Sequence, residues 1–324
     1  MLSQRGKRMK CLSARKLRLV VWGVIGMLWG AGGCATGKWG YVNPDDKIAI
    51  QPQFEDATPF TEGLAAVRIG EKWGYIDKKG NIVLQPQFDS AWSFRDGLAS
   101  VMTGNKWGFI DKTGKFVIQP QFESASSFSE KLAPVEAGGK WGFIDKTGEF
   151  VIQPQFQYAG RFSEGLAEVQ TVGRWGFIDK TGQMAIKPEY NLVFPFSEGL
   201  AAVLVGNKHG FIDKTGNMVI KPDFDNALSF GDGLAPVKVG LQWGYIDKTG
   251  QIVIKPQFEV AFPFHDGLAP VKVDYKWGYI FTTGQFAVWP KYDGAYSFSE
   301  GLAMIRVGRA TGYIDKTGRF IRGL

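Results

Sequence analysis

The chain has 324 residues, with 38 Lys and Arg against 31 Asp and Glu, for a formal net charge of +7. Seven of the basic residues and none of the acidic residues lie in the first 33 positions, so the remainder is formally neutral, 31 against 31. A neutral body argues against nucleic-acid binding, which requires clustered Lys and Arg to neutralise phosphates. The two cysteines, Cys11 and Cys34, leave residues 35–324 without a disulfide or a thiolate metal site.

Residues 1–33 have the layout of an export signal, with a basic start, an apolar run over 19–31 and a small-residue exit. A helix of that run would be about 20 Å long, too short for a hydrocarbon core of about 30 Å. The ending Ala31-Gly32-Gly33-Cys34 resembles a bacterial lipobox, although Ala31 stands where that motif usually has Leu. The resemblance implies a lipid on Cys34, which anchors the protein to a membrane at the cell envelope, at the outer membrane or the surface.

A Trp-Gly dipeptide, or a substitute for it, recurs every 34 residues through the rest of the chain. The Trp anchors are Trp39, Trp73, Trp107, Trp141, Trp175, Trp243 and Trp277, and His209 and Thr311 fill the other two places. A fixed period of this length is typical of a repeat protein. We predict a signal peptide over 1–33 and one repeat domain over 34–324, with nine units anchored at 39, 73, 107, 141, 175, 209, 243, 277 and 311.

Each unit reads as three strands and no helix, because Gly and Pro recur every few residues and β-branched or aromatic residues lie between them. In the unit around Trp107 we expect strands over 98–103, 106–111 and 115–118. Gly104-Asn105 suits a two-residue hairpin turn, and Gly114 suits the left-handed position of the next turn. The side chain of Asp111 can accept hydrogen bonds from the amides of that second turn.

Proline positions suggest how the units are arranged. Pro120 should end the third strand, and Pro134, Pro236 and Pro270 fall inside first strands, which should therefore pair on one side only. We predict an all-β fold of three-stranded antiparallel meanders in an open β-solenoid or superhelical array. The alternative is a β-propeller, whose blades usually have four strands. A recurring Phe, such as Phe128, should fill the gap between units.

The phrase K-W-G-[YF]-I-D-K-T-G, repeated in phase over residues 38–324, resembles the WG (KWG) repeat family of bacterial proteins. That resemblance implies a repetitive β domain, often exported, with no established biochemical activity. A weaker likeness to the aromatic hairpins of choline-binding cell-wall repeats suggests glycan binding.

The sequence contains few residues in patterns typical of a catalytic or metal site. The aspartates equivalent to Asp111 are interpreted as turn residues, and calcium binding is the alternative, although one carboxylate per turn is too few for that ion. The two histidines, His209 and His265, do not make a zinc site. We therefore predict a protein that is not an enzyme and has neither a metal nor a cofactor.

Two kinds of position remain as candidate ligand contacts. The repeat tryptophans should pack between units, whereas Trp92 and Trp289 lie outside that phase and could be exposed contacts. In the first strand one position varies freely and should face water; its basic members are Arg68, Lys238, Lys272 and Arg306. The leading hypothesis is an envelope lipoprotein whose array is a protein–protein interaction scaffold. The second is binding of cell-wall or surface glycan through rows of aromatic rings.

Overall fold

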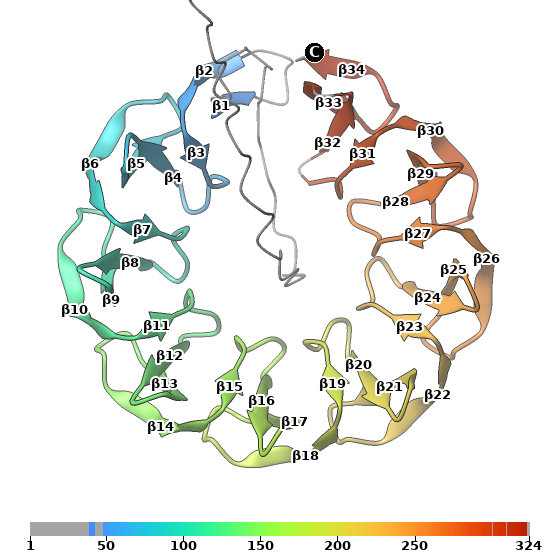
Figure 1. Ribbon diagram of the computed structural model, residues 1–324, viewed down its shortest axis with the longest axis horizontal. Coiled ribbons are helices and arrows are strands. Elements are labelled where there is room, and N and C mark those ends of the chain that lie inside the picture. The colour runs from blue at the N-terminus through green and yellow to red at the C-terminus, as the bar shows by residue number, and fades with distance from the viewer. Residues whose placement is uncertain (1–38, 43–47, 300, 309, 323–324) are drawn as a thin grey trace, which may run out of the picture.

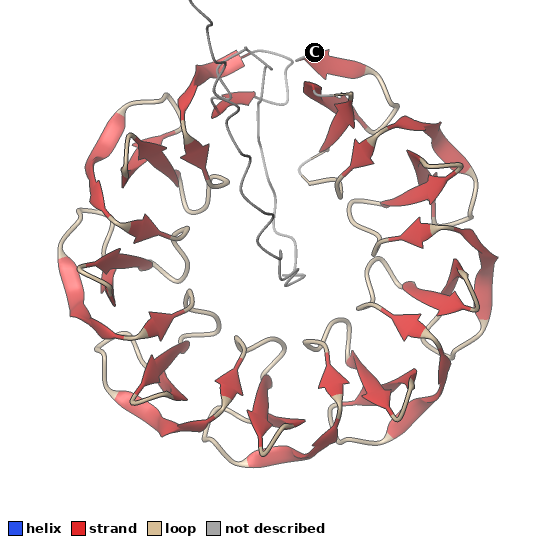
Figure 2. Ribbon diagram, in the orientation of Figure 1, coloured by secondary structure: helices blue, strands red, loops and turns tan. Residues whose placement is uncertain are grey.

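The structure is a computed structural model, and it describes residues 39–42, 48–299, 301–308 and 310–322. These residues form 34 β-strands in nine antiparallel sheets, and Figure 2 shows strands and loops throughout the described part. Within that part, no helix is long and apolar enough to cross a membrane. The predicted signal and Cys34 lie outside the described residues.

The sheets follow one another along the chain and are named blades 1 to 9. Blade 1 pairs β1 (Trp39–Val42) with β2 (Ile48–Phe54). Blade 2 contains β3 (Asp56–Ala57), β4 (Leu64–Ile69), β5 (Lys72–Asp77) and β6 (Ile82–Phe88). Blade 3 contains β7 (Ser90–Ala91), β8 (Ala99–Thr103), β9 (Lys106–Ile110) and β10 (Phe116–Phe122). Blade 4 contains β11 (Ser124–Ala125), β12 (Ala133–Ala137), β13 (Lys140–Ile144) and β14 (Phe150–Phe156).

The later blades repeat this order. Blade 5 contains β15 (Tyr158–Ala159), β16 (Ala167–Thr171), β17 (Arg174–Ile178) and β18 (Met184–Tyr190). Blade 6 contains β19 (Leu192–Val193), β20 (Leu200–Val205), β21 (Lys208–Asp213) and β22 (Met218–Phe224). Blade 7 contains β23 (Asn226–Ala227), β24 (Ala235–Val239), β25 (Gln242–Ile246) and β26 (Ile252–Phe258). Blade 8 contains β27 (Val260–Ala261), β28 (Leu268–Val273), β29 (Lys276–Phe281) and β30 (Phe286–Tyr292). Blade 9 contains β31 (Gly294–Ala295), β32 (Leu302–Val307), β33 (Ala310–Asp315) and β34 (Phe320–Arg322).

The nine blades form a ring, a nine-bladed β-propeller, in which the end of the chain returns to its start (Figure 1). The fourth strands run around the circumference, and the loops after the short first strands point to the centre (Figure 1). The predicted all-β repeat is confirmed. The preferred open solenoid is not what the structure shows, and the propeller that was the alternative is correct.

The two turns of each unit have the predicted conformations. In blade 3, Gly104 and Asn105 both have positive φ, 60° and 64°, between β8 and β9. The Oδ1 atom of Asp111 accepts hydrogen bonds from the Thr113 amide at 2.9 Å and the Lys115 amide at 3.1 Å. Gly114 has a φ of 86° in the same turn. These two turns place the second, third and fourth strands side by side.

The prediction that Pro120 ends the outer strand is wrong, because β10 continues to Phe122. The register of β10 on β9 shifts between Ile118 and Phe122, and a bulge of this kind tolerates a proline that cannot donate to the ladder. Gly108 lies under the bulge: a Cβ there would be 2.6 Å from the Ile118 carbonyl oxygen and 2.7 Å from Pro120 N. The constant Gly and the constant Pro therefore serve one close backbone contact.

The predicted three-stranded unit is also wrong, because a two-residue strand adds a fourth. In blade 4, β11 pairs with the second strand through Ser124 opposite Glu136 and Ala125 opposite Val135. Pro134 precedes Val135 in the second strand. On the side that faces β11, it contributes only its carbonyl oxygen, which accepts a hydrogen bond from the Ser126 amide at 3.0 Å. A second strand that contains proline can thus pair on both sides, since the ladder does not need the missing N–H.

The core lies between blades. Each of eight buried clusters joins two successive blades, from blades 1 and 2 to blades 8 and 9. One cluster contains Ala99 and Val101 of the second strand, Phe94 of the loop before it, and Phe88 and Phe116 of the outer strands β6 and β10. Phe128 is buried, and its ring centroid lies 5.0 Å from that of Phe109 in the previous blade. It therefore fills the gap between units, as predicted.

One buried aromatic position differs around the ring. In blades 1, 2, 7 and 8 it is tyrosine, and its hydroxyl donates to a backbone carbonyl of the next blade at 2.8–2.9 Å: Tyr41 to Thr58, Tyr75 to Trp92, Tyr245 to Phe262 and Tyr279 to Tyr296. In blades 3 to 6 the same position is phenylalanine: Phe109, Phe143, Phe177 and Phe211. Those four blades pack by apolar contact alone at this point.

Candidate interaction surface

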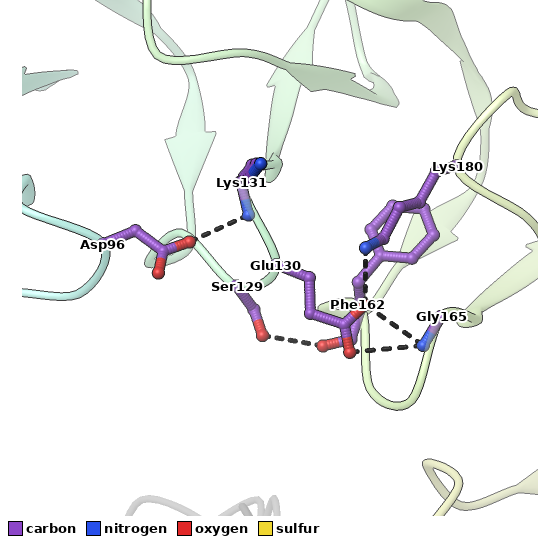
Figure 3. Close-up of polar contacts among 7 residues, drawn as sticks. All are labelled: Asp96, Ser129, Glu130, Lys131, Phe162, Gly165 and Lys180. Carbon is purple, nitrogen blue, oxygen red and sulfur yellow. Dashed lines mark hydrogen bonds and ion pairs between the residues drawn. The ribbon is translucent and has the colours of Figure 1, made fainter.

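The central rim is built from two-residue turns between the first and second strands, and their acidic residues link the blades. Glu130 accepts a hydrogen bond from the Gly165 amide of the next blade at 3.1–3.2 Å (Figure 3). The same link occurs at seven successive interfaces, with the acceptors Glu62, Asp96, Glu130, Glu164, Glu198, Asp232 and Asp266. These carboxylates therefore hold the ring together.

Other side chains strengthen the rim. Lys180 forms an ion pair with Glu130 at 2.9 Å, and Ser129 donates to the Phe162 carbonyl at 2.7 Å (Figure 3). The Glu130 pKa is lowered although burial opposes ionisation, because the Lys180 ammonium and the Gly165 amide favour the carboxylate. In blade 4 the second turn residue is Lys131, not glycine, with a φ of 76°. Its amide donates to Asp96 at 2.8 Å (Figure 3).

A second set of acids links the blades on the opposite face, beside the turns that join the second and third strands. We name these turns the hairpin tips. Asp225 accepts from Lys208 of the previous blade at 2.7 Å and from the Gly240 amide at the tip of its own blade at 2.6 Å. The Lys208 hydrogen bond holds the pKa of Asp225 below its usual range. The polar residue that recurs at this position in blades 2 to 9 thus has a structural role.

The repeated turn aspartates have the structural role that was expected. The hydrogen bond from the Thr113 hydroxyl, at 2.6 Å, is the main cause of the lowered pKa of Asp111. No group of three or more His, Cys, Asp or Glu side chains among the described residues could hold a metal ion. His209 is buried in place of a repeat Trp, and burial lowers its pKa because the charged form is disfavoured.

The hairpin tips of blades 5, 7 and 8 carry the most exposed apolar side chains among the described residues. Val172 is 93% exposed, Leu241 86% and Tyr275 81%. Val205 of blade 6 and Val239 of blade 7 are also exposed and lie at the adjoining strand ends. We call these five residues the tip surface. Exposed apolar groups on successive modules are typical of a surface that binds a partner.

Two tips are also conformationally unusual. Val172 has a φ of 49°, and Tyr275 has a φ of 62°. Positive φ is uncommon for a non-glycine residue and is a true outlier for a β-branched one. The equivalent tip residues in blades 2 to 4 include Gly70, Gly104 and Gly138. An apolar side chain on Val172 is therefore kept against its backbone preference, which is typical of functional positions.

The structure separates the six predicted ligand contacts. Lys238 and Lys272 lie beside the tip surface, opposite Trp243 and Trp277, and Lys272 Nζ lies 5.4 Å from the Tyr275 ring centroid. Arg306 occupies the same position in blade 9 and Arg68 in blade 2. Trp92, 52% exposed, follows β7, and Trp289, 71% exposed, lies on the outer strand β30. The two tryptophans thus lie on other parts of the blade than the four basic residues, which are all on second strands.

The repeat tryptophans lie at the contacts between blades, as expected. Trp73, Trp107, Trp141, Trp175 and Trp277 are half-buried and pack on the inter-blade clusters, Trp243 is buried within one, and Trp39 packs on the first. At one place three aromatic rings pack in a row: the ring centroid of Tyr158 lies 5.6 Å from that of Trp141 and 5.4 Å from that of Trp175. This group is partly exposed.

Blade 5 holds a polar group that the repeat does not require. Glu168 is buried where other blades have Ala, Ser, Pro or Met, and its Oε2 atom has no hydrogen-bond partner. Gly160 makes room for it, because a methyl group there would overlap the carboxylate. Burial raises the pKa of Glu168 to about 7, and nearby Arg161 lowers it less. Sequence reasoning did not identify this group, although Glu168 is the one ionisable residue at this position in blades 2 to 9.

Comparison with solved structures shows likeness at low sequence identity. A chain described as a eukaryotic initiation factor matches with a TM-score of 0.63 at 12% identity, over 88% of this chain and 93% of that one. The dihydro-heme d1 dehydrogenase NirN in complex with DHE matches with a TM-score of 0.48 at 11% identity, over 80% of this chain and 72% of that one. The first likeness concerns the fold alone. The search of curated proteins found no significant match.

The comparison with protein families agrees with the phase of the repeat. The family described as WG containing repeat matches eight times, over 39–73, 73–107, 107–141, 141–173, 175–208, 210–240, 243–277 and 277–309. These segments cover most of the chain and begin at or next to the anchor positions. The constant Trp-Gly pairs that define them are the ones that build the inter-blade contacts and the close Gly–Pro approach. The chain therefore belongs to the WG containing repeat family.

Proposed function

We propose that this protein is a non-enzymatic scaffold of the bacterial cell envelope that binds another protein through the tip surface. The observation that carries the proposal is the exposure of Val172, Leu241 and Tyr275 on one face of the ring. The acidic residues at the rim and beside the hairpin tips already bond between blades, as Glu130 and Asp225 do, so they are not available for a partner. Association buries exposed apolar area, and aromatic anchors such as Tyr275 often dominate such contacts.

The chemistry beside the tip surface indicates the kind of partner. Lys238 and Lys272 flank the apolar tips of blades 7 and 8. Lys272 also forms an ion pair with Glu259 at 3.6 Å, which partly neutralises its charge. The border of the tip surface is therefore mildly basic and not strongly charged. A protein with an apolar centre and acidic residues around it would fit this surface, because complementary charge at the border favours encounter and register.

A photo-crosslinking amino acid placed at Tyr275 or Leu241 tests the proposal in cells that express the protein. We expect a discrete protein adduct from both positions and none from Asn105, the matched tip position in blade 3. The double variant Leu241→Asp, Tyr275→Asp should remove an adduct formed from position 172. Equal adducts at position 105, or no adduct at any tip, would reject the tip surface.

Membrane attachment through Cys34 is a separate part of the proposal and rests on the lipobox-like sequence. Replacement of Cys34 by Ser should abolish labelling with a fatty-acid analogue and release the protein from the membrane fraction. Labelling that persists in the Cys34→Ser protein would place the anchor elsewhere.

Glycan binding is the second candidate function, and the continuous rings of Trp141, Tyr158 and Trp175 favour it. Flat aromatic faces with polar neighbours suit sugar rings. Peptidoglycan fragments should then change the tryptophan fluorescence of the native protein but not of the Tyr158→Ala variant. Identical responses in the two proteins would exclude this group as a sugar site.

A further inference from the structure

Blade 8 departs from the repeat at two exposed positions near its outer edge. Phe281 stands where blades 2 to 7 and blade 9 have the turn aspartate, and Trp289 stands where the outer strands of blades 2 to 7 have Gln or Lys. Phe281 is 45% exposed and Trp289 is 71% exposed. The frame does not require either side chain, because the other blades form the same sheet without it. Both replacements add apolar surface that is in contact with water.

The replacement at Phe281 removes hydrogen bonds that the other turns have. In blade 7 the Oδ1 atom of Asp247 accepts hydrogen bonds from the Thr249 amide at 2.9 Å and the Gln251 amide at 3.0 Å. A phenyl ring cannot accept them, and in blade 8 the Gln285 amide instead lies at the long distance of 3.5 Å from a threonine hydroxyl. A departure from a local rule without a gain in folding is typical of a functional position.

Packing at the joint between blades 7 and 8 holds both aromatic residues in place. The ring of Trp289 stacks on that of Phe286, with centroids 4.7 Å apart and planes at 29°. Phe286 in turn packs on the buried cluster that joins the two blades. The turn that follows Phe281 contacts blade 7 directly, because a Cβ on Gly284 would lie 3.3 Å from the Ile254 side chain. The exposed rings are therefore fixed on a rigid part of the molecule.

The outer strands of the same two blades also carry positive charge. Lys255 is the one charged residue of β26, and Lys291 is the one charged residue of β30; both are exposed. In blades 5 and 6 the outer strand contains a lysine and an acid, as in Lys187 and Glu189, and in blades 2 to 4 it contains neither. We name Lys255, Phe281, Trp289 and Lys291 the outer patch.

The position and chemistry of the outer patch indicate what it contacts. The outer strands run around the circumference of the ring, a convex edge that meets a flat surface at one place (Figure 1). Trp side chains are enriched at the lipid–water interface, and lysines there keep their ammonium groups beside anionic headgroups. Ile252 and Val253, 50% and 48% exposed, extend the apolar area at the start of β26. Apolar area and positive charge together are what an anionic bilayer surface binds.

We propose that the outer patch contacts the surface of a bilayer that contains anionic lipids. The inference goes beyond the proposed function, because it assigns a second surface with a different partner. It is also separate from the proposed lipid on Cys34, which attaches the chain but does not orient the ring. Contact at the circumference leaves both faces of the ring, and with them the tip surface, open to a protein.

The repeat itself supplies matched variants for the test. Phe281→Asp, Trp289→Gln, Lys255→Gln and Lys291→Gln each introduce the residue that blade 4 has at the same position. Blade 4 folds with these residues, so the variants should fold, and circular dichroism with thermal unfolding checks this. Each protein is the full chain with Cys34→Ser, so all of them lack the lipid and share the same residues 1–38.

Vesicle flotation measures the partition of each protein onto phosphatidylcholine that contains about a quarter of phosphatidylglycerol. We expect the variant with all four changes to bind at least tenfold more weakly than its parent, because each lysine near an anionic surface contributes about fivefold. On pure phosphatidylcholine the Lys255→Gln, Lys291→Gln variant should bind like the parent, whereas Phe281→Asp, Trp289→Gln should still bind more weakly. High salt should remove the contribution of the lysines alone.

Controls on other blades separate the outer patch from net charge. Lys187→Gln removes an exposed lysine at the repeat position of Lys255 and should change binding less than twofold. A loss equal to that of Lys255→Gln would overturn the proposal, as would equal binding of the parent and the four-residue variant.

A protein partner at the outer patch is a distinct outcome of the test. A protein adduct from a photo-crosslinker at position 289, with vesicle binding unaffected by the four changes, would assign the patch to a protein and reject the bilayer. The Leu241→Asp, Tyr275→Asp protein should bind vesicles as its parent does. A failure of the tip surface and a failure of the outer patch are therefore distinguishable.

Discussion

The hairpin tips of blades 2 to 4 and those of blades 5, 7 and 8 share one frame but present different surfaces. The earlier tips are Gly70-Glu71, Gly104-Asn105 and Gly138-Gly139, whereas the later ones include Val172, Leu241 and Tyr275. Both groups are fastened by the same acid-to-amide hydrogen bonds, such as Asp89 to Gly104 at 2.8 Å and Asp225 to Gly240 at 2.6 Å. Repetition therefore fixes the frame, and function can only be carried by what varies on it.

Substitutions in the frame that both groups share should destabilise the protein equally, whichever group carries them. In Gly108→Ala of blade 3 and Gly244→Ala of blade 7, the new Cβ would meet a carbonyl oxygen at 2.6 and 2.5 Å. We expect each change to lower the free energy of unfolding by more than about 3 kcal/mol, because backbone must move to relieve the overlap. Denaturant unfolding measures this. A large difference between the two variants would show that the frame itself differs between the two groups.

Glu168 marks blade 5, where the apolar tips begin, and should make stability depend on pH. Its folded pKa of about 7 lies above the ordinary value of 4.5, so the folded chain holds an extra proton between these values. The free energy of unfolding should therefore fall as pH rises from about 4.5 to 7, by about 3 kcal/mol, and stay low above pH 7. Glu168→Gln should remove this dependence in thermal unfolding scans. A wild-type profile parallel to that of the variant would contradict the burial of the charge.

The rim links of blades 4 and 6 should contribute equally to the free energy of unfolding. Glu130→Ala and Glu198→Ala each remove an ion pair, at 2.9 and 3.0 Å, and hydrogen bonds to the next blade's amide. We expect each to cost about 1 kcal/mol, because these contacts are partly exposed and screened. High salt should reduce the effect. A loss several times larger at one position would mean that the interfaces are not equivalent.

The Val172→Gly variant tests the smallest difference between the two groups, because it gives the hairpin tip of blade 5 the Gly-Gly sequence of the blade 4 tip. Relief of the positive φ should raise the free energy of unfolding by up to about 1 kcal/mol. Adduct formation by a photo-crosslinker at Tyr275 should decrease in the same variant. Lys131→Gly is the control, since it relieves the same strain at the rim and should leave adduct formation unchanged. No stabilisation in either variant would refute the strain at both positions.

The sequence predicts the local structure well. Gly104-Asn105, Asp111 and Gly114 define the two turns through backbone rules that act within a few residues, and the 34-residue period gives the unit. The tryptophans and Phe128 were correctly expected between units, since a side chain that recurs in every module has to serve a contact that recurs. These inferences need no knowledge of the whole molecule.

The errors arise where a longer-range fact decides. A strand of two residues, such as Ser124–Ala125, has no periodicity to detect. Pro120 and Pro134 obey the rules for proline, but the register that satisfies those rules depends on the neighbouring strands. Closure of the ring depends on the angle between successive blades, which is set by packing over the whole interface and not by any short stretch of sequence. Glu168 could have been found, because it is the one ionisable residue at a position that is Ala, Ser, Pro or Met in the other four-stranded blades.

The tyrosine hydroxyls described above have a mechanical consequence. Blades 1, 2, 7 and 8 are bonded to the following blade by the tyrosine hydroxyl. Blades 4, 5 and 6, which have phenylalanine at that position, are bonded to the following blade by a serine at the rim, because Ser129, Ser163 and Ser197 donate to the Phe162, Phe196 and Phe230 carbonyls at 2.7–2.9 Å. We expect a force that opens the ring to be resisted at the buried tyrosine in one group of joints and at the rim serine in the other.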